Sequence, residues 1–261
     1  MEAVEPARVV AVCIYYDENP RWLSEHFASL APICRDFVYV DGAYALFPGA
    51  FAQPNSPMAC EEAIHEMARA TQRPVLHYKP KAPFFGNEVE KRNMSLDLAR
   101  SLPGVVGDPN VWFLVADADT VAIKVNDALP EILARTELNV AEFSAQDENL
   151  LESDWADQTP NPHDRWAMVR WAEKFKAVHV RSIYRNLPGL RYGPAHWHVS
   201  YGLPGRERSW LWGGHLRKCE GSLDLSMDLK FEHRRERREK GRNDAAERYY
   251  EARDLAQIEL G

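Results

Sequence analysis

The sequence predicts an α/β fold in which a mostly parallel central sheet is flanked by helices. Over the first 120 residues, short apolar segments alternate with segments of helical periodicity, which is the pattern of β-α-β units. The segment 111–119, VWFLVADAD, begins as a nearly continuous apolar run, which is typical of a strand covered on both faces. The length of 261 residues suits a single large domain.

The elements of this first half follow from local patterns. Strands are expected where β-branched and aromatic residues cluster and polar residues follow. These segments are 9–16, 37–40, 75–78 and 111–119. Helices are expected where the residue pattern has helical spacing, as in the segment that places Trp22, His26 and Leu30 on one side. These segments are 21–30, about 59–70 and about 87–101.

After residue 123 the alternation loosens. The pattern predicts a helix near 126–135, a strand at 139–144 and an antiparallel pair near 167–171 and 177–184. A further apparent strand, LDLSMDLKFEH, ends at His233. The charged segment 231–261 has helical propensity, so we expect a charged C-terminal helix.

Composition and charge exclude several classes of protein. Apolar residues make up 45% and charged residues 27% of the chain, which is the balance of a folded globular protein and not of a disordered one. No stretch approaches the ~18 consecutive apolar residues of a membrane span, and the N-terminus lacks the features of a signal peptide. The four cysteines form no CxxC pair, so we expect reduced thiols in a cytoplasmic protein.

Basic residues are concentrated near the C-terminus. The net charge is −7, yet segment 230–242 holds seven Lys or Arg residues against three Glu. A basic patch on an otherwise acidic protein suits contact with one local anionic group better than binding along an extended nucleic acid.

Three of the predicted parallel strands end in polar groups, at Tyr15-Tyr16-Asp17, at Asp41-Gly42 and at Asp117-Ala118-Asp119. Ligands of such sheets bind outside the carboxyl ends of the strands. Two carboxylates at i and i+2 can reach one point if the backbone turns between them, and hard oxygen ligands suit Mg²⁺ or Mn²⁺. The sequence therefore predicts a metal site at Asp117 and Asp119.

Several motifs together resemble family 2-type glycosyltransferases with the GT-A fold, including those that bacteriophages encode. The motifs are Asp41, Gly86-Asn87 followed by Lys91-Arg92-Asn93, the strand WFLVADAD at 112–119, and Arg185-Asn186-Leu187-Pro188-Gly189. The resemblance covers roughly residues 8–235. It implies a single Rossmann-like GT-A domain with a nucleotide-sugar-binding half (1–122), an acceptor-side half (123–230) and the C-terminal basic segment (231–261).

The resemblance also implies the activity and the roles of individual residues. It implies metal-dependent transfer of a sugar from a nucleotide-sugar, with UDP the favoured nucleotide, to an acceptor hydroxyl. Tyr15 and Asp41 would hold the base and ribose, and Arg92, with Lys91 as the competing choice, would face the phosphates. Asp117 would contact ribose or the metal. Asp119 would bind Mn²⁺ or Mg²⁺, with His233 as a further ligand.

The catalytic base departs from the family pattern, because no Glu-Asp dipeptide follows Asp119. His196 and His198 would share one face of a strand, and a histidine is an adequate general base near neutral pH. The other candidates are Asp147, Glu148, Asp224 and Asp228. Both inverting and retaining stereochemistry remain open.

The sequence does not identify the acceptor, and two functions other than glycosyl transfer are alternatives. Modified DNA, bound through Arg234, Arg235, Arg237 and Arg238, and a protein are the acceptors considered. A sugar-phosphate nucleotidyltransferase shares the α/β architecture and the metal-binding carboxylates. However, such an enzyme usually has a Gly-rich basic loop after its first strand, where this chain has Tyr-Tyr-Asp-Glu-Asn-Pro. The other rival is a non-catalytic nucleic-acid-binding protein that uses segment 230–242.

Overall fold

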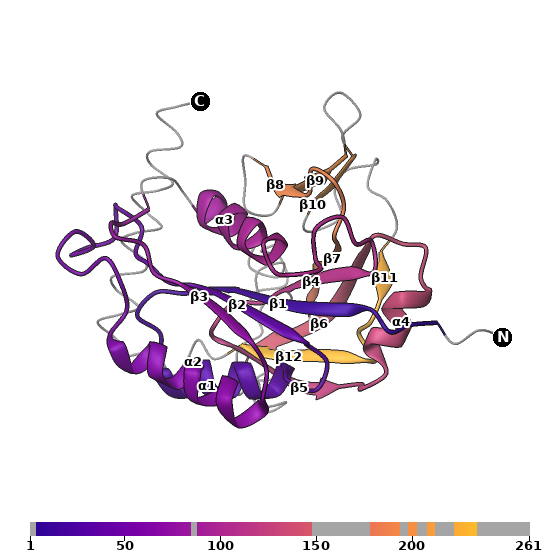
Figure 1. Cartoon of the computed structure of the whole chain (residues 1–261), viewed down its shortest axis with the longest axis horizontal. Helices are drawn as coiled ribbons and strands as arrows, with labels where there is room; N and C mark the ends of the chain where they lie inside the picture. Colours follow the sequence, from indigo (N-terminus) through magenta and orange to yellow (C-terminus); the bar gives the residue numbers. More distant parts are fainter. Residues whose placement is uncertain are drawn as a thin grey trace, which may run out of the picture.

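The computed structural model describes residues 4–84, 88–147, 178–193, 198–202, 208–211 and 222–233. Nine strands of this part form one sheet, and four helices lie beside it (Figure 1). The predicted α/β class is therefore confirmed.

One half of the sheet is parallel. Its strands lie in the order β3-β2-β1-β4, and each runs in the same direction as its neighbour. Their bounds are β1 (Arg8–Ile14), β2 (Asp36–Val40), β3 (Val75–Tyr78) and β4 (Val111–Val115). All residues of β2 and β4 are buried, because helices or other strands cover both faces of this half.

The other half of the sheet is mixed, which corrects the expectation of a mostly parallel sheet. β7 is antiparallel to both of its neighbours, β4 and β6. β12 is parallel to β6 but antiparallel to β5. The short β11 also pairs with β6. The bounds are β5 (Thr120–Val125), β6 (Val140–Asp147), β7 (Val178–Arg185), β11 (Leu223–Asp224) and β12 (Leu229–His233). Only residues 116–119 connect β4 to β5, yet the two strands do not pair, because β7, β6 and β12 lie between them in the strand order.

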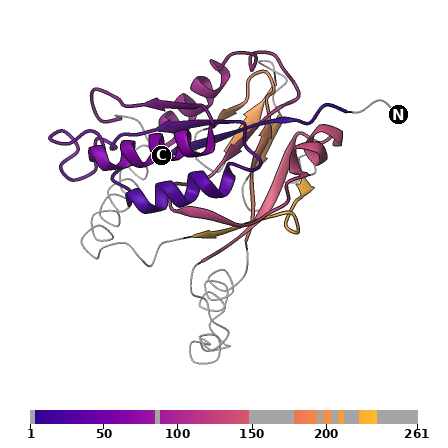
Figure 2. The same ribbon diagram turned by 60° about the horizontal axis from the view of Figure 1, so that its bottom comes forward.

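Helices cover the two faces of the parallel half. In Figure 1, α3 lies on one face, and α1 and α2 lie on the other, where Figure 2 shows them next to each other. Two apolar cores result, one on each face of the sheet. The helices are α1 (Pro20–Leu30), α2 (Met58–Thr71), α3 (Glu88–Arg100) and α4 (Leu129–Arg135).

A small antiparallel sheet lies on the side of α3 (Figure 1). Its strands are β8 (Arg191–Tyr192), β9 (His198–Tyr201) and β10 (Arg208–Leu211). Asn93 on α3 holds β8 with two hydrogen bonds, because its side-chain amide donates to the Tyr192 carbonyl and its side-chain oxygen accepts from the Tyr192 N–H.

Several predicted boundaries differ from the observed ones. β1 ends at Ile14 and β4 at Val115, so the polar residues of both segments lie beyond the strands. The predicted strand that ends at His233 is two strands, β11 and β12, and β5 was not predicted. The predicted strand 167–171 lies outside the described residues, as does the C-terminal helical segment beyond β12.

Candidate functional site

The order of the parallel strands creates a switch point between β1 and β4. From β1 the chain continues to β2 and β3 on one side, while β4 lies on the other side. In open α/β sheets, ligands bind outside the carboxyl ends of the strands at such a point. The residues that follow β1 and β4 therefore define the candidate site, and the Asp117–Asp119 segment is among them.

The segment Asp117-Ala118-Asp119 forms a tight turn between β4 and β5. Both the N–H and the hydroxyl of Thr120 donate to the Asp117 carbonyl, at 3.0 and 2.6 Å. The Asp117 side chain is 51% exposed, whereas Asp119 is buried. The turn thus presents one carboxylate at the surface and the other just beneath it.

His26 of α1 supports this turn from inside the molecule. Its Nδ1–H donates to the Thr120 carbonyl at 2.7 Å, which assigns the tautomer with the proton on Nδ1. Burial lowers the pKa of His26, although this hydrogen bond and the nearby Asp117 and Asp119 act in the opposite direction. The His26 Nε2 has no hydrogen-bond partner within the described part of the chain. The turn therefore rests on a neutral imidazole.

Arg92 lies directly beside the turn. Its guanidinium contacts the carboxylates of Asp117 at 2.8 Å and Glu88 at 2.6 Å, and it lies over the Tyr192 ring at 5.6 Å. Burial alone would lower the pKa of Arg92, but Asp117 and Glu88 raise it well above its usual value. A permanent positive charge is thereby held next to Asp117 at the switch point.

Lys91, the neighbour of Arg92, has a different environment. It is 1% exposed, and its Nζ donates to the carbonyls of Tyr15 and Gly42 at 2.5 and 2.6 Å. Burial lowers its pKa to about 7, although the nearby Asp41 favours the charged form. Lys91 therefore ties together the chain segments that follow β1 and β2, and Arg92 is the member of the pair that reaches the Asp117 turn.

Asp41 is buried and engaged within the protein. One carboxylate oxygen accepts from the Gly42 N–H and the Ser56 hydroxyl, at 2.6 and 2.5 Å, and the other accepts from the Ser56 N–H at 2.9 Å. Gly42 has a φ of +119°, and a Cβ there would lie 2.5 Å from the Pro80 Cγ. Asp41 therefore anchors the loop that follows β2.

Tyr15 is also buried, and its hydroxyl lies 2.7 Å from the His77 Nε2 of β3. Burial raises the pKa of this phenol, so its proton stays in place at ordinary pH. The Tyr15 side chain is thus directed along the sheet toward β3.

The register of β12 places His233 close to the Asp117 turn. His233 pairs with Thr120 of β5 on one side and with Asp147 of β6 on the other. Adjacent strands are about 4.8 Å apart, so the backbone of His233 lies next to the residue that follows Asp119. The structure describes only the backbones of His233 and Asp147. It nevertheless brings two residues distant in sequence, a predicted metal ligand and a candidate base, to one sheet edge.

The other candidate bases are distributed differently. Asp228 lies at the opposite end of β12 from His233, and its side chain accepts a hydrogen bond from the Asn126 side chain. Asp224 lies in β11, where it pairs with Glu142 of β6. His198 begins β9 in the small sheet, where its backbone alone is described. His196, Glu148 and the four arginines Arg234, Arg235, Arg237 and Arg238 lie outside the described residues.

Sequence reasoning missed a group of ligand-type side chains next to Tyr15. Glu61 and His65 of α2 and His77 of β3 bring their donor atoms within 4.8 Å of one another. The spacing of Glu61 and His65, at i and i+4 on a predicted helix, was the signal in the sequence. His77 could not be added to it, because its proximity depends on how α2 packs beside β3.

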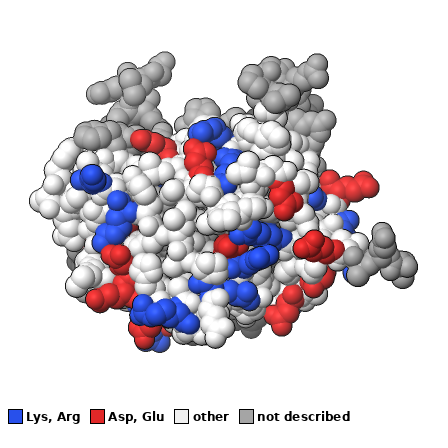
Figure 3. Space-filling model, viewed as in Figure 1, with Lys and Arg blue, Asp and Glu red and all other residues white. Residues whose placement is uncertain are grey.

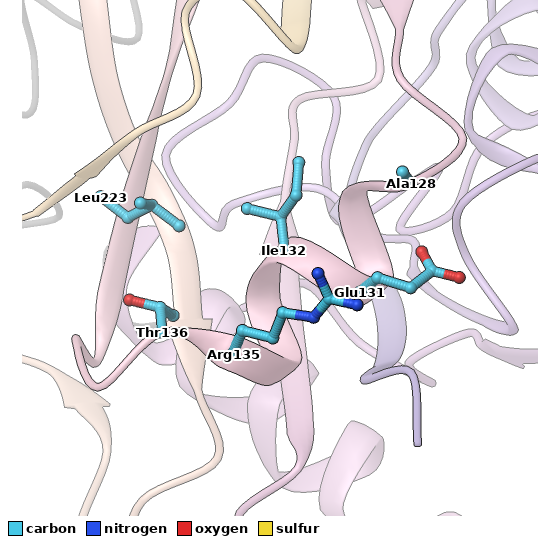
Figure 4. Close-up of a pocket in the computed structure, with 6 residues that line it drawn as sticks. All are labelled: Ala128, Glu131, Ile132, Arg135, Thr136 and Leu223. Atoms are coloured by element: carbon cyan, nitrogen blue, oxygen red, sulfur yellow. The ribbon is translucent and has the colours of Figure 1, made fainter. Parts of the chain in front are cut away.

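A surface hollow lies far from these groups. Its lining residues come from α4, its flanking segments and β11, and they are Ala128, Glu131, Ile132, Arg135, Thr136 and Leu223 (Figure 4). The Ala7 N–H donates to the Pro130 carbonyl, so α4 lies at the amino end of β1. The hollow therefore lies near the amino ends of the parallel strands, whereas the switch point lies at their carboxyl ends. None of the predicted site residues lines the hollow.

Acidic and basic side chains are intermingled over the face of the molecule drawn in Figure 3. Within the described part of the chain, no helix is long and apolar enough to span a membrane. No protein-family model matches the sequence, and no curated protein matches it significantly.

Proposed function

We propose that this protein is a metal-dependent glycosyltransferase that moves a sugar from a nucleotide-sugar, with UDP the favoured nucleotide, to an acceptor hydroxyl. The observation that supports the proposal best is the position of the Asp117–Asp119 turn. It follows β4 at the switch point of the parallel strands, with the guanidinium of Arg92 beside it. Acidic residues and a fixed cation at a ligand-binding edge suit a bound metal–diphosphate group.

The chemistry of the side chains fits a hard divalent cation. Asp117 and Asp119 supply carboxylate oxygens, which Mg²⁺ and Mn²⁺ prefer, and the register places His233 near enough to be considered as a third ligand. When bound, such an ion would neutralise charge on a diphosphate leaving group. Asp119 is the ligand we regard as essential, because the resemblance assigns it direct metal binding, whereas it assigns Asp117 to the ribose or the metal.

The roles of the surrounding residues follow from their contacts. Arg92 would attract donor phosphate oxygens as a fixed positive charge beside the turn, since its Nε and Nη2 already contact Glu88 and Asp117. In this proposal Tyr15 and Asp41 shape the base and ribose region through the backbone that they hold, since both side chains are engaged internally. Lys91 stabilises the same backbone.

If the transfer inverts the configuration at the anomeric carbon of the sugar, a base must take the proton of the attacking acceptor hydroxyl. His196 and His198 stay our candidates, and Asp147 joins them because its backbone lies beside His233. The acceptor class, modified DNA or a protein, stays a prediction, and the basic segment 230–242 favours an anionic acceptor such as modified DNA.

A thermal-shift panel tests the proposal. The 261-residue chain would be titrated with UDP-, GDP- and dTDP-sugars, each with Mn²⁺ and with EDTA. We expect one nucleotide-sugar to raise the Tm only when Mn²⁺ is present. The increase should disappear in Asp119→Asn and persist in Asp127→Asn, an exposed aspartate that follows β5 and provides the matched control.

Three results would contradict the proposal. One is a Tm that no nucleotide-sugar changes, and another is an increase that EDTA leaves intact. The third is full metal-dependent binding by Asp119→Asn. Release of pyrophosphate from a nucleoside triphosphate and a sugar phosphate would instead support the nucleotidyltransferase, and steeply salt-dependent DNA binding alone would support the nucleic-acid-binding protein.

A further inference from the structure

A second group of potential metal ligands lies between α2 and β3. Glu61 and His65 are one helical turn apart on α2, so their side chains share one face of the helix. His77 lies in β3, which is the edge strand of the parallel half. Three ligand-type side chains from two elements thus meet at one place.

The donor atoms already face one another. The Glu61 Oε1 lies 3.9 Å from the His65 Nε2 and 3.8 Å from the His77 Nδ1, and all three atoms are within 4.8 Å of each other. In a tetrahedral site with metal–ligand bonds near 2.0 to 2.1 Å, neighbouring ligand atoms are roughly 3.3 Å apart. Small side-chain rotations would therefore bring these atoms to ligand distance, without movement of α2 or β3.

The remaining polar atoms of Glu61 and His77 have partners of the kind that support metal ligands. The His77 Nε2 is 2.7 Å from the Tyr15 hydroxyl, and with Nε2–H as donor the Nδ1 lone pair faces Glu61. The Glu61 Oε2 accepts from the Lys79 Nζ at 2.7 Å, so Oε1 is the oxygen directed at the histidines. Metal-binding histidines and carboxylates are commonly oriented by such second contacts.

The group is accessible from solvent on one side. The His77 side chain is 3% exposed, whereas those of Glu61 and His65 are 34% and 39% exposed. An ion could therefore enter from the surface while the buried imidazole holds the inner position. Three protein ligands leave a fourth position for water or for an anionic group.

We propose that Glu61, His65 and His77 bind a divalent transition-metal ion of the Zn²⁺ class. Imidazole nitrogens with one carboxylate favour Zn²⁺, Co²⁺ or Ni²⁺ over Mg²⁺. The site is distinct from the Asp117 turn, because β3 and β4 are three strand spacings, roughly 14 Å, apart. The bound ion joins α2 to β3 and lies next to Tyr15 at the candidate donor site.

Metal titration of the purified 261-residue chain tests this inference. After removal of metal with EDTA and dialysis, the protein would be titrated with Co²⁺ and with Zn²⁺, followed by visible absorption and calorimetry. We expect one equivalent of Co²⁺ to give the intense visible bands of a four- or five-coordinate site, and Zn²⁺ to displace it. His65→Ala and Glu61→Gln should each weaken metal binding by at least tenfold.

Matched variants separate this site from other metal-binding groups. Glu62→Gln and Glu66→Gln alter exposed glutamates of the same helix and should leave the affinity unchanged. Tyr15→Phe removes the partner of the His77 Nε2 and should weaken binding tenfold to a hundredfold. Asp119→Asn should leave it unchanged, so failure of the glycosyltransferase proposal would not remove this signal.

The inference is overturned if the wild-type chain binds neither Co²⁺ nor Zn²⁺ saturably. It is equally overturned if His65→Ala and Glu61→Gln bind these ions as tightly as the wild type. Circular dichroism of each variant would verify that α2 is intact, and both substitutions introduce residues that helices tolerate well.

Discussion

Two carboxylates follow strands that flank β1 on either side, yet they have opposite environments. Asp41, after β2, is 1% exposed and accepts three hydrogen bonds from Gly42 and Ser56. Asp117, after β4, is half exposed and has Arg92 as its side-chain partner. The Asp41 carboxylate is buried with both oxygens occupied and holds the loop after β2, whereas about half of the Asp117 side chain is accessible to solvent. Position at a strand end therefore does not identify a binding residue without its contacts.

Exchange of each aspartate for alanine gives the largest expected difference between the two regions. Asp41→Ala leaves the buried N–H groups of Gly42 and Ser56 without their acceptor, so we expect a loss of about 3 to 5 kcal/mol of unfolding free energy. Asp117→Ala should cost less than about 1 kcal/mol, because Arg92 keeps its contact with Glu88. Urea unfolding of both variants measures the difference, and equal losses would show that the two carboxylates have similar structural roles.

Substitution of Gly42 tests the rigidity of the loop that Asp41 anchors. Gly42→Ala combines a positive φ with a Cβ 2.5 Å from the Pro80 Cγ and 2.9 Å from Phe84, so we expect a loss of about 2 to 3 kcal/mol. Gly49→Ala is the matched control. Gly49 also has a positive φ, but a Cβ there meets no atom within 4 Å of it, so about 1 kcal/mol is expected. Thermal unfolding would reveal whether the close approach matters, and similar values for both would show that it does not.

The pH dependence of stability tests the contacts that Lys91 makes beneath the same loop. Burial lowers its folded-state pKa to about 7, whereas an unfolded lysine titrates near 10.5. Between these values the unfolded chain binds the proton and the folded chain does not. The unfolding free energy therefore rises with pH above about 7, by up to about 1.4 kcal/mol per pH unit, and has no slope from this group below pH 7.

Comparison with Lys91→Met isolates this contribution from other titrating groups. The unfolding free energy of the wild type minus that of Lys91→Met should increase from pH 7.5 to pH 10. Urea unfolding at several pH values measures it. A difference that stays constant over this range would show that Lys91 remains protonated in the folded protein, held by the Tyr15 and Gly42 carbonyls and by Asp41.

Local patterns in the sequence determined most of the parallel half. The segments that form β1, β2, β3 and β4 were predicted at nearly their observed positions. The signal was strongest for β4, because a strand buried on both faces must be apolar throughout. The same reasoning placed Asp117 and Asp119 just beyond β4. β5 directly follows this acidic turn and was missed, although its sequence TVAIKV is mostly apolar. The sheet as a whole was expected to be mostly parallel, but its second half is mixed.

Only the tertiary structure decided which of the predicted residues are available to a ligand. The engagement of Asp41 with Ser56, the proximity of His233 to Thr120 and the meeting of His77 with Glu61 each join residues far apart in the chain. Such contacts depend on the order of the strands and on the packing of helices against them. A sequence pattern repeats over a few residues and carries no record of that order. The sequence thus determined which chemical groups reach the sheet edge, and the fold determined which of them contact one another.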